Sequence, residues 1–331
     1  MQRLFPVGQF MLLILLSLTN ITPILAEEAN ITLGGFIKAD FGTGDRFNDN
    51  RGEDRLGVSK AAIALKAELN GITGVIVYGT ERLTDGNGNN DGDTDLKDAF
   101  IVIDELFGQK IDLTMGAQPV LFGLKPNGYP GDRSIQPSVE YGAAGAFSVA
   151  DQSGPAIMSN YRLSDALTLR VGFFDLDSSS NFGNSGSQIN DNGIIELRAS
   201  TINDTNFYGL VGLEYIYVGG AVDSSKPIFD LGLGWQNNLF DISAEYIRLD
   251  QAITGTNEDE TYFIVESTYQ LSSDLKVYAD WANADELDVD TFRLGTGWQW
   301  HPNVSFALEW AYDRVNGNDN NSLDLRCQFE F

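Results

Sequence analysis

Apolar and polar residues alternate along most of this chain. In the segment 166–175 (ALTLRVGFFD), every second residue from Leu167 is apolar, and Thr168 and Arg170 fall on the opposite parity. The segments 303–313 (NVSFALEWAYD) and 323–331 (LDLRCQFEF) repeat the pattern. Because successive side chains of a β-strand point to opposite faces, this period of two predicts strands with one apolar and one polar face.

The connections between these segments alternate in length. Short ones such as 70–71 (NG), 164–165 (SD) and 237–238 (NN) are followed by longer ones rich in Gly, Asn, Asp and Ser. This order is typical of an antiparallel meander with its tight turns at one end. The expected strands are sixteen: 31–41, 55–69, 72–83, 95–106, 110–119, 154–163, 166–176, 193–202, 206–218, 227–236, 239–249, 260–270, 274–284, 289–300, 303–313 and 321–331.

Two classes of all-β protein fit this alternation. A soluble sandwich or solenoid would bury the apolar face, whereas a transmembrane barrel turns it toward lipid around a wet lumen. Strands of about 9–11 residues match the tilted span of a bilayer. Aromatic residues gather near strand ends on the apolar parity, as in the girdles of membrane barrels: Trp235, Trp281, Trp298, Trp300, Trp310, Tyr215, Tyr217, Tyr246, Tyr269 and Tyr312.

The polar parity favours the barrel. It carries both Lys/Arg and Asp/Glu residues, with the acidic ones in excess, and unpaired charges are costly to bury in a dry core. A barrel of sixteen strands leaves an aqueous channel. We therefore predict an all-β fold, a transmembrane antiparallel barrel in which the interval 120–153 is too long for a simple turn.

The first 26 residues read as a targeting segment. Arg3 precedes an apolar run from Phe10 to Leu18, and Ala26 is a small residue before EE. A run of this length is shorter than the roughly 20 residues of a membrane helix. We expect a secretory signal peptide over 1–26 and a barrel domain over 27–331, with an uncleaved anchor helix as the alternative.

Composition excludes several functions. The net charge of −26, from 47 acidic and 21 basic residues, disfavours a nucleic-acid partner. The single cysteine, Cys327, excludes an intramolecular disulfide, and the single histidine, His301, lies in a short turn (WHPN). We therefore do not expect an enzyme.

Two stretches resemble Gram-negative outer-membrane porins. The alternation that ends in Phe329 and Phe331 resembles the C-terminal strand that the barrel-insertion machinery reads. The segment 98–126, with GAQPVLFGLKP, resembles the strand–turn–strand before the third long loop of phosphate-selective-type porins. The resemblance implies an outer-membrane location beside lipopolysaccharide, a 16-stranded barrel, a homotrimer, and a third long loop (120–153) folded into the pore.

A loop in that position would supply the pore constriction. Its charged residues would face arginines of the wall across a narrow passage and so filter solutes by charge; alternatively, the arginines simply pair with neighbouring lumen acids. The constriction candidates are Lys125, Asp132, Arg133, Glu140 and Asp151 of the loop and Arg170, Arg198, Arg293 and Arg326 of the wall. Because the lumen is rich in acids, we predict passive diffusion of small hydrophilic solutes and ions with weak cation preference. The alternative is a structural or adhesive barrel that its loops plug.

The segment 84–98 (TDGNGNNDGDTDLKD) has nearly the spacing of a calcium loop. An EF-hand is excluded because strand-like segments flank it and Asn87 stands where the first Asp ligand belongs. As an extracellular hairpin loop, it would turn Asp91, Asp93 and Asp95 toward lipopolysaccharide, where Ca²⁺ or Mg²⁺ would bridge the two. No other cofactor is expected.

Overall fold

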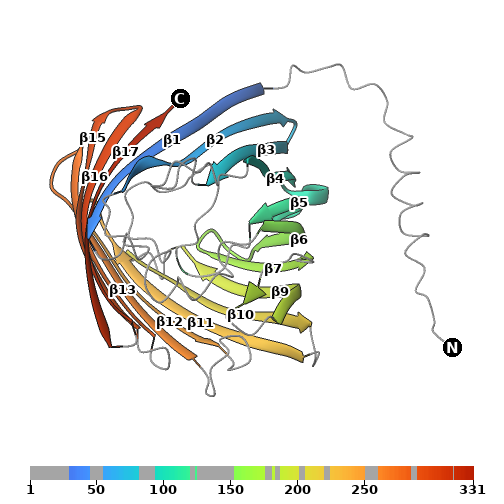
Figure 1. Ribbon diagram of the computed structural model, residues 1–331. Coiled ribbons are helices and arrows are strands. Elements are labelled where there is room, and N and C mark those ends of the chain that lie inside the picture. The colour runs from blue at the N-terminus through green and yellow to red at the C-terminus, as the bar shows by residue number, and fades with distance from the viewer. Residues whose placement is uncertain are drawn as a thin grey trace.

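The computed structural model describes residues 30–44, 55–81, 94–119, 124, 153–175, 181–182, 187–200, 206–219, 224–249, 260–284, 289–315 and 317–331. These residues form one antiparallel sheet whose strands stand side by side in a ring (Figure 1). The strands are β1 (Asn30–Gly44), β2 (Arg55–Leu69), β3 (Ile72–Glu81), β4 (Thr94–Ile103), β5 (Ile111–Pro119), β6 (Ser153–Arg162), β7 (Leu167–Asp175), β8 (Asn181–Phe182), β9 (Ser187–Ala199), β10 (Phe207–Gly219), β11 (Ser224–Gln236), β12 (Phe240–Leu249), β13 (Glu260–Gln270), β14 (Leu275–Ala284), β15 (Val289–His301), β16 (Val304–Val315) and β17 (Asn318–Glu330).

All sixteen strands expected from the alternation have a counterpart, and two local expectations were wrong. The strand expected from residue 193 begins at Ser187, and the two-residue β8 pairs with its start. The connection expected over 314–320 is a tight turn, because β16 continues to Val315 and β17 begins at Asn318. Gly317, with a φ of 76°, supplies the left-handed backbone that this turn needs.

The sheet closes on itself between β1 and β17. β1 pairs with β2 on one side and with β17 on the other, where Phe36 lies opposite Glu330. Beyond that pair, Gly35 and Phe331 exchange two backbone N–H···O bonds of 3.0 Å. A Cβ on Gly35 would clash with the backbone oxygen of Ala62 and lie 2.7 Å from Cζ of Phe331, so glycine is required at this seam. Closure leaves no unpaired edge, which a bilayer does not tolerate.

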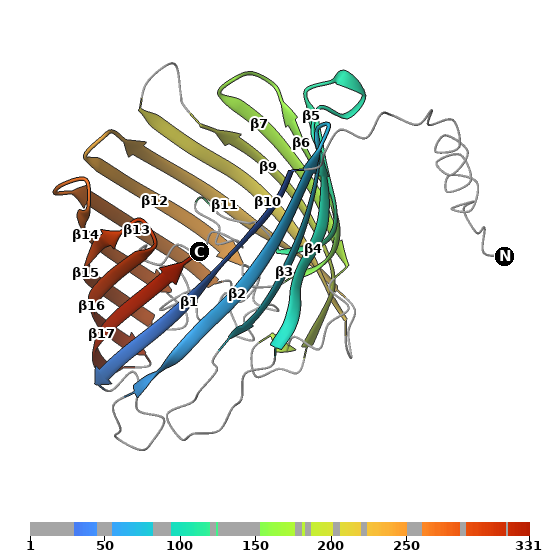
Figure 2. The same ribbon diagram turned by 90° about the horizontal axis from the view of Figure 1, so that it is seen from above.

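The two faces of the sheet differ as the alternation predicts. Large apolar side chains are exposed on the outer face of the ring, among them Ile63, Val171 and Leu294. Carboxylates and hydroxyls of the opposite parity, such as Glu309 and Ser305, are buried on the inner face. The strands run obliquely side by side (Figure 2). This arrangement is a transmembrane β-barrel with an apolar exterior.

Aromatic pairs mark the outer face. Trp298 stacks on Phe306 with ring centroids 5.9 Å apart, close to the short turn between β15 and β16. Nearer the other end of the strands, Phe292 meets Trp310 edge-on at 5.9 Å. These positions are those of the two expected girdles.

No helix among the described residues is long and apolar enough to cross a membrane. In the described part of the chain, a short 3₁₀ turn, Leu106–Gly108, lies between β4 and β5.

Two tyrosines of the inner wall each lie over a glycine of the next strand. Tyr278 of β14 faces Gly295 of β15 and donates a hydrogen bond of 2.9 Å to Glu309 of β16. Tyr208 of β10 likewise faces Gly234 of β11 and donates one of 2.6 Å to Asp241 of β12. A Cβ at either glycine would overlap the tyrosine ring. Each glycine therefore lets one side chain bridge three strands.

Replacing such a glycine should destabilise the barrel. We expect Gly295→Ala to displace the ring of Tyr278 and to lower the free energy of unfolding by about 1–3 kcal/mol, the usual cost of overpacking. Urea unfolding in detergent, followed by tryptophan fluorescence, measures the change. Gly193→Ala is the matched control, because nothing lies within 4 Å of a Cβ there. Equal stability of the two variants would show that the tyrosine does not depend on its glycine.

Candidate functional site

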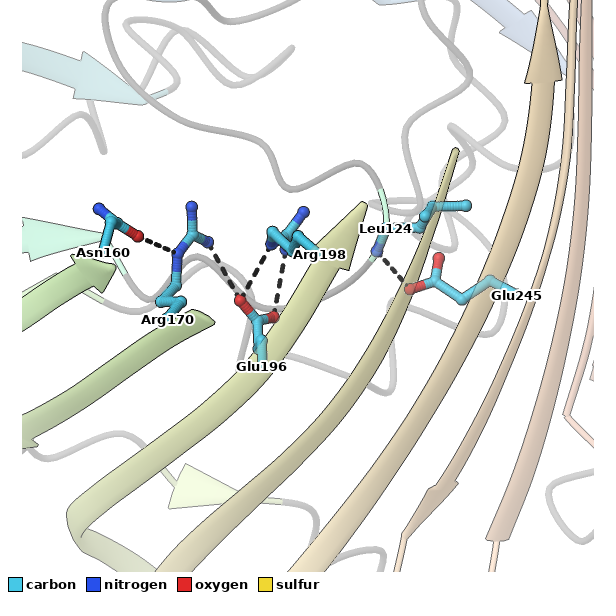
Figure 3. A network of polar contacts seen from close by, with 6 residues as sticks. All are labelled: Leu124, Asn160, Arg170, Glu196, Arg198 and Glu245. Carbon is cyan, nitrogen blue, oxygen red and sulfur yellow. Dashed lines mark hydrogen bonds and ion pairs between the residues drawn. The ribbon is translucent and has the colours of Figure 1, made fainter. Parts of the chain in front are cut away.

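A polar network occupies the inner wall where β6, β7 and β9 lie side by side. The register places Asn160, Arg170 and Glu196 in one row across these strands, with Arg198 two residues further along β9. Figure 3 shows the four side chains pointing toward one another on the wall. Each comes from the polar parity of its strand, so alternation alone brings them to the inner face.

Two arginines share one carboxylate in this network. Arg198 donates from Nε to Glu196 Oε2 and from Nη2 to Oε1, both at 3.1 Å. Arg170 donates from Nη1 to the same Oε2 at 3.2 Å and from Nε to Asn160 Oδ1 at 3.0 Å. The Glu196 side chain is fully buried. Because one negative charge faces two positive charges, the cluster of these three groups carries a net positive charge.

Carboxylates follow on the next strands of the ring. Glu214 of β10, Asp230 of β11, Glu245 of β12 and Glu266 of β13 all lie buried on the inner face. On β14 and β15, Asp280 and Arg293 face each other and form an ion pair of 3.0 Å. The wall therefore carries a sector of acidic character next to the arginine pair.

One residue of the third long connection lies against this acidic sector. The backbone N–H of Leu124 donates to Glu245 Oε1 at 2.6 Å, and the Leu124 residue is buried (Figure 3). Its side chain sits on Gly232, where an added Cβ would lie 2.9 Å from Leu124 Cβ. Leu124 follows β5 in the chain but contacts β11 and β12, so the chain enters the lumen at this point. We call Leu124, Gly232 and Glu245 the Leu124 anchor.

The wall arginines proposed as partners of the constriction loop lie in two parts of the barrel. Arg170 and Arg198 come together on β7 and β9, whereas Arg293 lies on β15 and Arg326 on β17, across the ring in Figure 1. Arg326 contacts Asp324 at 3.2 Å. All four arginines therefore contact a carboxylate of the inner wall, which is the pairing that the sequence left open.

The remaining predicted site residues are not placed. Lys125, Asp132, Arg133, Glu140 and Asp151 lie outside the described residues, as do Asp91 and Asp93 and the segment 1–26. Asp95 lies in β4 opposite Gly79, and its side chain is outside the description. Within the described part of the chain, no three His, Cys, Asp or Glu side chains are grouped to hold a metal ion. The surface cation site remains a prediction.

The C-terminal residues lie at the closing seam. Phe329 is exposed on the outer face of β17, and its ring stacks on that of Phe331 at 6.0 Å. His301, at the end of β15, accepts a hydrogen bond on Nδ1 from the backbone N–H of Asn303 at 3.3 Å. It acts there as part of the turn.

Sequence reasoning missed the contacts that organise the site. Glu196 and Glu245 fall on the polar parity, but nothing local marks them as partners of two arginines or of a loop residue. Leu124 is an apolar residue in a segment without period-two alternation, and Gly232 is one of 35 glycines. A glycine on the lumen parity of a central strand is a signal of close approach, which is what Gly232 provides.

No protein-family model matches this sequence, and no curated protein matches it. Solved structures do. The chain superposes on the outer membrane channel DcaP of Acinetobacter baumannii with a TM-score of 0.66 at 12% identity, covering 92% of this chain and 97% of that one. It also superposes on the anion-selective porin from Comamonas acidovorans with a TM-score of 0.65 at 11% identity, covering 92% of this chain and 100% of that one. Its fold is that of the outer-membrane porins.

A third similar structure is the trimer form of OmpT, an outer membrane protein of Vibrio cholerae. Its TM-score is 0.59 at 12% identity, and the match covers 92% of this chain and 100% of that one. At these identities the likeness concerns the fold. The porin fold places the Glu196 network and the Leu124 anchor on the inner wall of the barrel.

Removal of the carboxylate that Arg170 and Arg198 share should destabilise the barrel. We expect Glu196→Ala to lower the free energy of unfolding by about 3 kcal/mol or more, because two partly buried guanidinium groups lose their counter-charge. Urea unfolding in detergent measures it. Glu68→Ala is the control: Glu68 pairs with Lys66, both side chains are well exposed, and such pairs contribute about 1 kcal/mol or less. Equal losses would mean that Glu196 stabilises no more than a surface pair does.

Proposed function

We propose that this protein is a porin-type channel of the Gram-negative outer membrane, through which small hydrophilic solutes and ions diffuse passively with weak cation preference. The observation that carries the proposal is the contrast between the two faces of the closed sheet. An apolar outer face suits lipid, and an inner face lined by charged pairs suits a water-filled path. The excess of acidic over basic side chains on the inner wall supports the cation preference.

A second candidate is a barrel whose lumen is plugged, with a structural or adhesive role. The observation that favours it is the burial of inner-wall side chains such as Glu196, Glu214 and Asp230, each with no exposed surface. Neither candidate is an enzyme. A catalytic pairing of the Ser–His type would require His301, whose ring is engaged in a short turn.

Single-channel recording decides between the two candidates. We expect the purified protein in a planar bilayer to conduct in stepwise openings, because the wall is polar along its length. Under a KCl gradient, the reversal potential should be displaced slightly from zero toward the Nernst potential of K⁺. Absence of conductance from folded protein would favour the plugged barrel. Clear anion selectivity would leave the channel but reject the cation preference.

We further propose that the channel is a homotrimer that associates through the outer face of β2–β5. Two neighbouring outward residues there are small: Ala67 faces Gly74, and Ile101 follows on the other side of Gly74. A hollow of about 430 Å³ surrounds these residues, with Leu65, Ile76 and Met115 among its lining.

This sector also differs in its aromatic residues. Among the described outward residues of β2–β5, only Tyr78 is aromatic, whereas β15 and β16 carry Phe292, Trp298, Trp300, Phe306, Trp310 and Tyr312. Small residues favour close approach of protein to protein in a membrane, and aromatic residues at strand ends favour the lipid interface. The trimer form of a similar structure agrees with such an assembly.

A bulky residue on this face should dissociate the trimer. We expect Gly74→Trp to yield monomers, because the added ring occupies the space that the neighbouring copy needs. Native mass spectrometry from detergent reports the oligomeric state. Leu294→Trp is the matched control, since Leu294 is exposed on the outer face of β15. A wild-type monomer, or dissociation of both variants alike, would contradict the proposed interface.

Export and membrane insertion complete the proposal. A signal peptide over 1–26 would direct export, and Phe329 and Phe331 would be read by the barrel-insertion machinery. The position of both rings at the closing seam supports a role in the last step of closure. Acidic loops at the opposite end would face lipopolysaccharide.

A further inference from the structure

The charges near the Leu124 anchor differ in their access to the lumen. The side chains of Arg170 and Arg198 keep 15% and 21% of their surface exposed. The acidic residues beside them are covered: Glu214 and Asp230 have no exposed surface, and Glu245 and Glu266 keep 7% each. An ion passing this level therefore meets guanidinium groups more directly than carboxylates.

Leu124 is one residue that covers the acidic sector. Its side chain rests on Gly232, and Gly232 lies between the two acidic positions, two residues from Asp230 on β11 and opposite Glu245 on β12. The hydrogen bond to Glu245 fixes its backbone at the same point. Two independent contacts, one polar and one steric, thus hold one loop residue against one patch of wall.

We propose that the Leu124 anchor keeps the carboxylates of β11 and β12, Asp230 and Glu245, out of the ion path and thereby determines the ion selectivity of the channel. Glu245 and Gly232 are positioning residues in this scheme. Glu245 acts as an acceptor for a backbone N–H, and Gly232 acts through the side chain that it lacks. The inference rests on the proposed channel function, and it gives a physical reason to expect only a weak cation preference from an acid-rich wall.

The proposal predicts an unusual sign for one substitution. Glu245→Ala removes a negative charge from the lumen, so a simple sum of wall charges predicts a lower cation preference. Release of Leu124 has the opposite effect, because it uncovers Asp230, which lies two residues from Gly232 on the same face of β11. We expect the cation-to-anion permeability ratio of Glu245→Ala to rise by about twofold or more.

The conservative variant separates the charge from the hydrogen bond. Glu245→Gln keeps an oxygen that accepts from the Leu124 N–H and loses the charge. Because that charge is covered, we expect the permeability ratio and the conductance of Glu245→Gln to stay at the wild-type values. A fall in cation preference in both Glu245 variants would overturn the proposal, since it would show that the carboxylate already faces the ions.

Gly232→Val tests the steric contact without touching any charge. Its methyl groups would occupy the seat of Leu124, so we expect the same rise in cation preference as for Glu245→Ala. Gly193→Val, on the outer face of β9, is the control for a bulkier residue in a strand, because a Cβ at Gly193 meets nothing within 4 Å. Reversal potentials in a KCl gradient measure all four variants. An unchanged ratio in Gly232→Val would refute the role of the anchor.

A disulfide tests the anchor without any current measurement. Leu124→Cys with Gly232→Cys, in a Cys327→Ser background, places two Cβ atoms within a small shift of disulfide geometry. We expect oxidation to cross-link the pair in folded protein while leaving selectivity at the wild-type value. Failure to cross-link would overturn the anchor itself. Cross-linking in a protein that does not conduct would instead refute the channel function and leave the contact intact.

Discussion

The structure depends on one constraint: every backbone N–H and C=O of the sheet needs a partner, since lipid supplies none. A meander of strands meets this demand along its length, and only closure meets it at the ends. Closure here is made by the pairing of β1 with β17 and by the two hydrogen bonds between Gly35 and Phe331. The glycine permits the last ring to lie at the seam.

Closure also decides where charge can reside. Once the apolar parity faces outward, the polar parity of every strand converges on one enclosed space, and the register decides which charges meet. Arg170 faces Glu196, and Asp280 faces Arg293, because those residues lie opposite each other on neighbouring strands. Glycines at Gly234 and Gly295 then allow tyrosines to cross the wall and bond to carboxylates beyond. Strand register thus determines which charged side chains meet on the inner wall.

The strands could be predicted from the sequence, whereas the side-chain contacts between them could not. Alternation identified each long strand because the rule is local and repeats over about ten residues. The connection around Gly317 was expected to be longer than it is. Asn-Gly is a strong hairpin signal, but the polar residues on both sides of it concealed the ends of the two strands. The pairs of Arg198 and Arg326 depend on side-chain reach within one strand, and that of Arg170 depends on register between strands. Leu124 carries no local signal, since its partners lie more than a hundred residues away in the chain.

The same distinction changes how charge in a pore should be counted. Parity assigns a residue to the lumen, but it does not say whether the residue meets water. Glu196 belongs to the lumen by parity and has no exposed surface, because two guanidinium groups enclose its carboxylate. The energetic influence of a charge on a passing ion grows as the intervening medium becomes less polar and the distance shorter, and it weakens when a counter-charge lies closer than the ion does. Parity therefore overstates how many wall charges a passing ion would meet, because a paired and covered carboxylate such as that of Glu196 does not face the lumen directly.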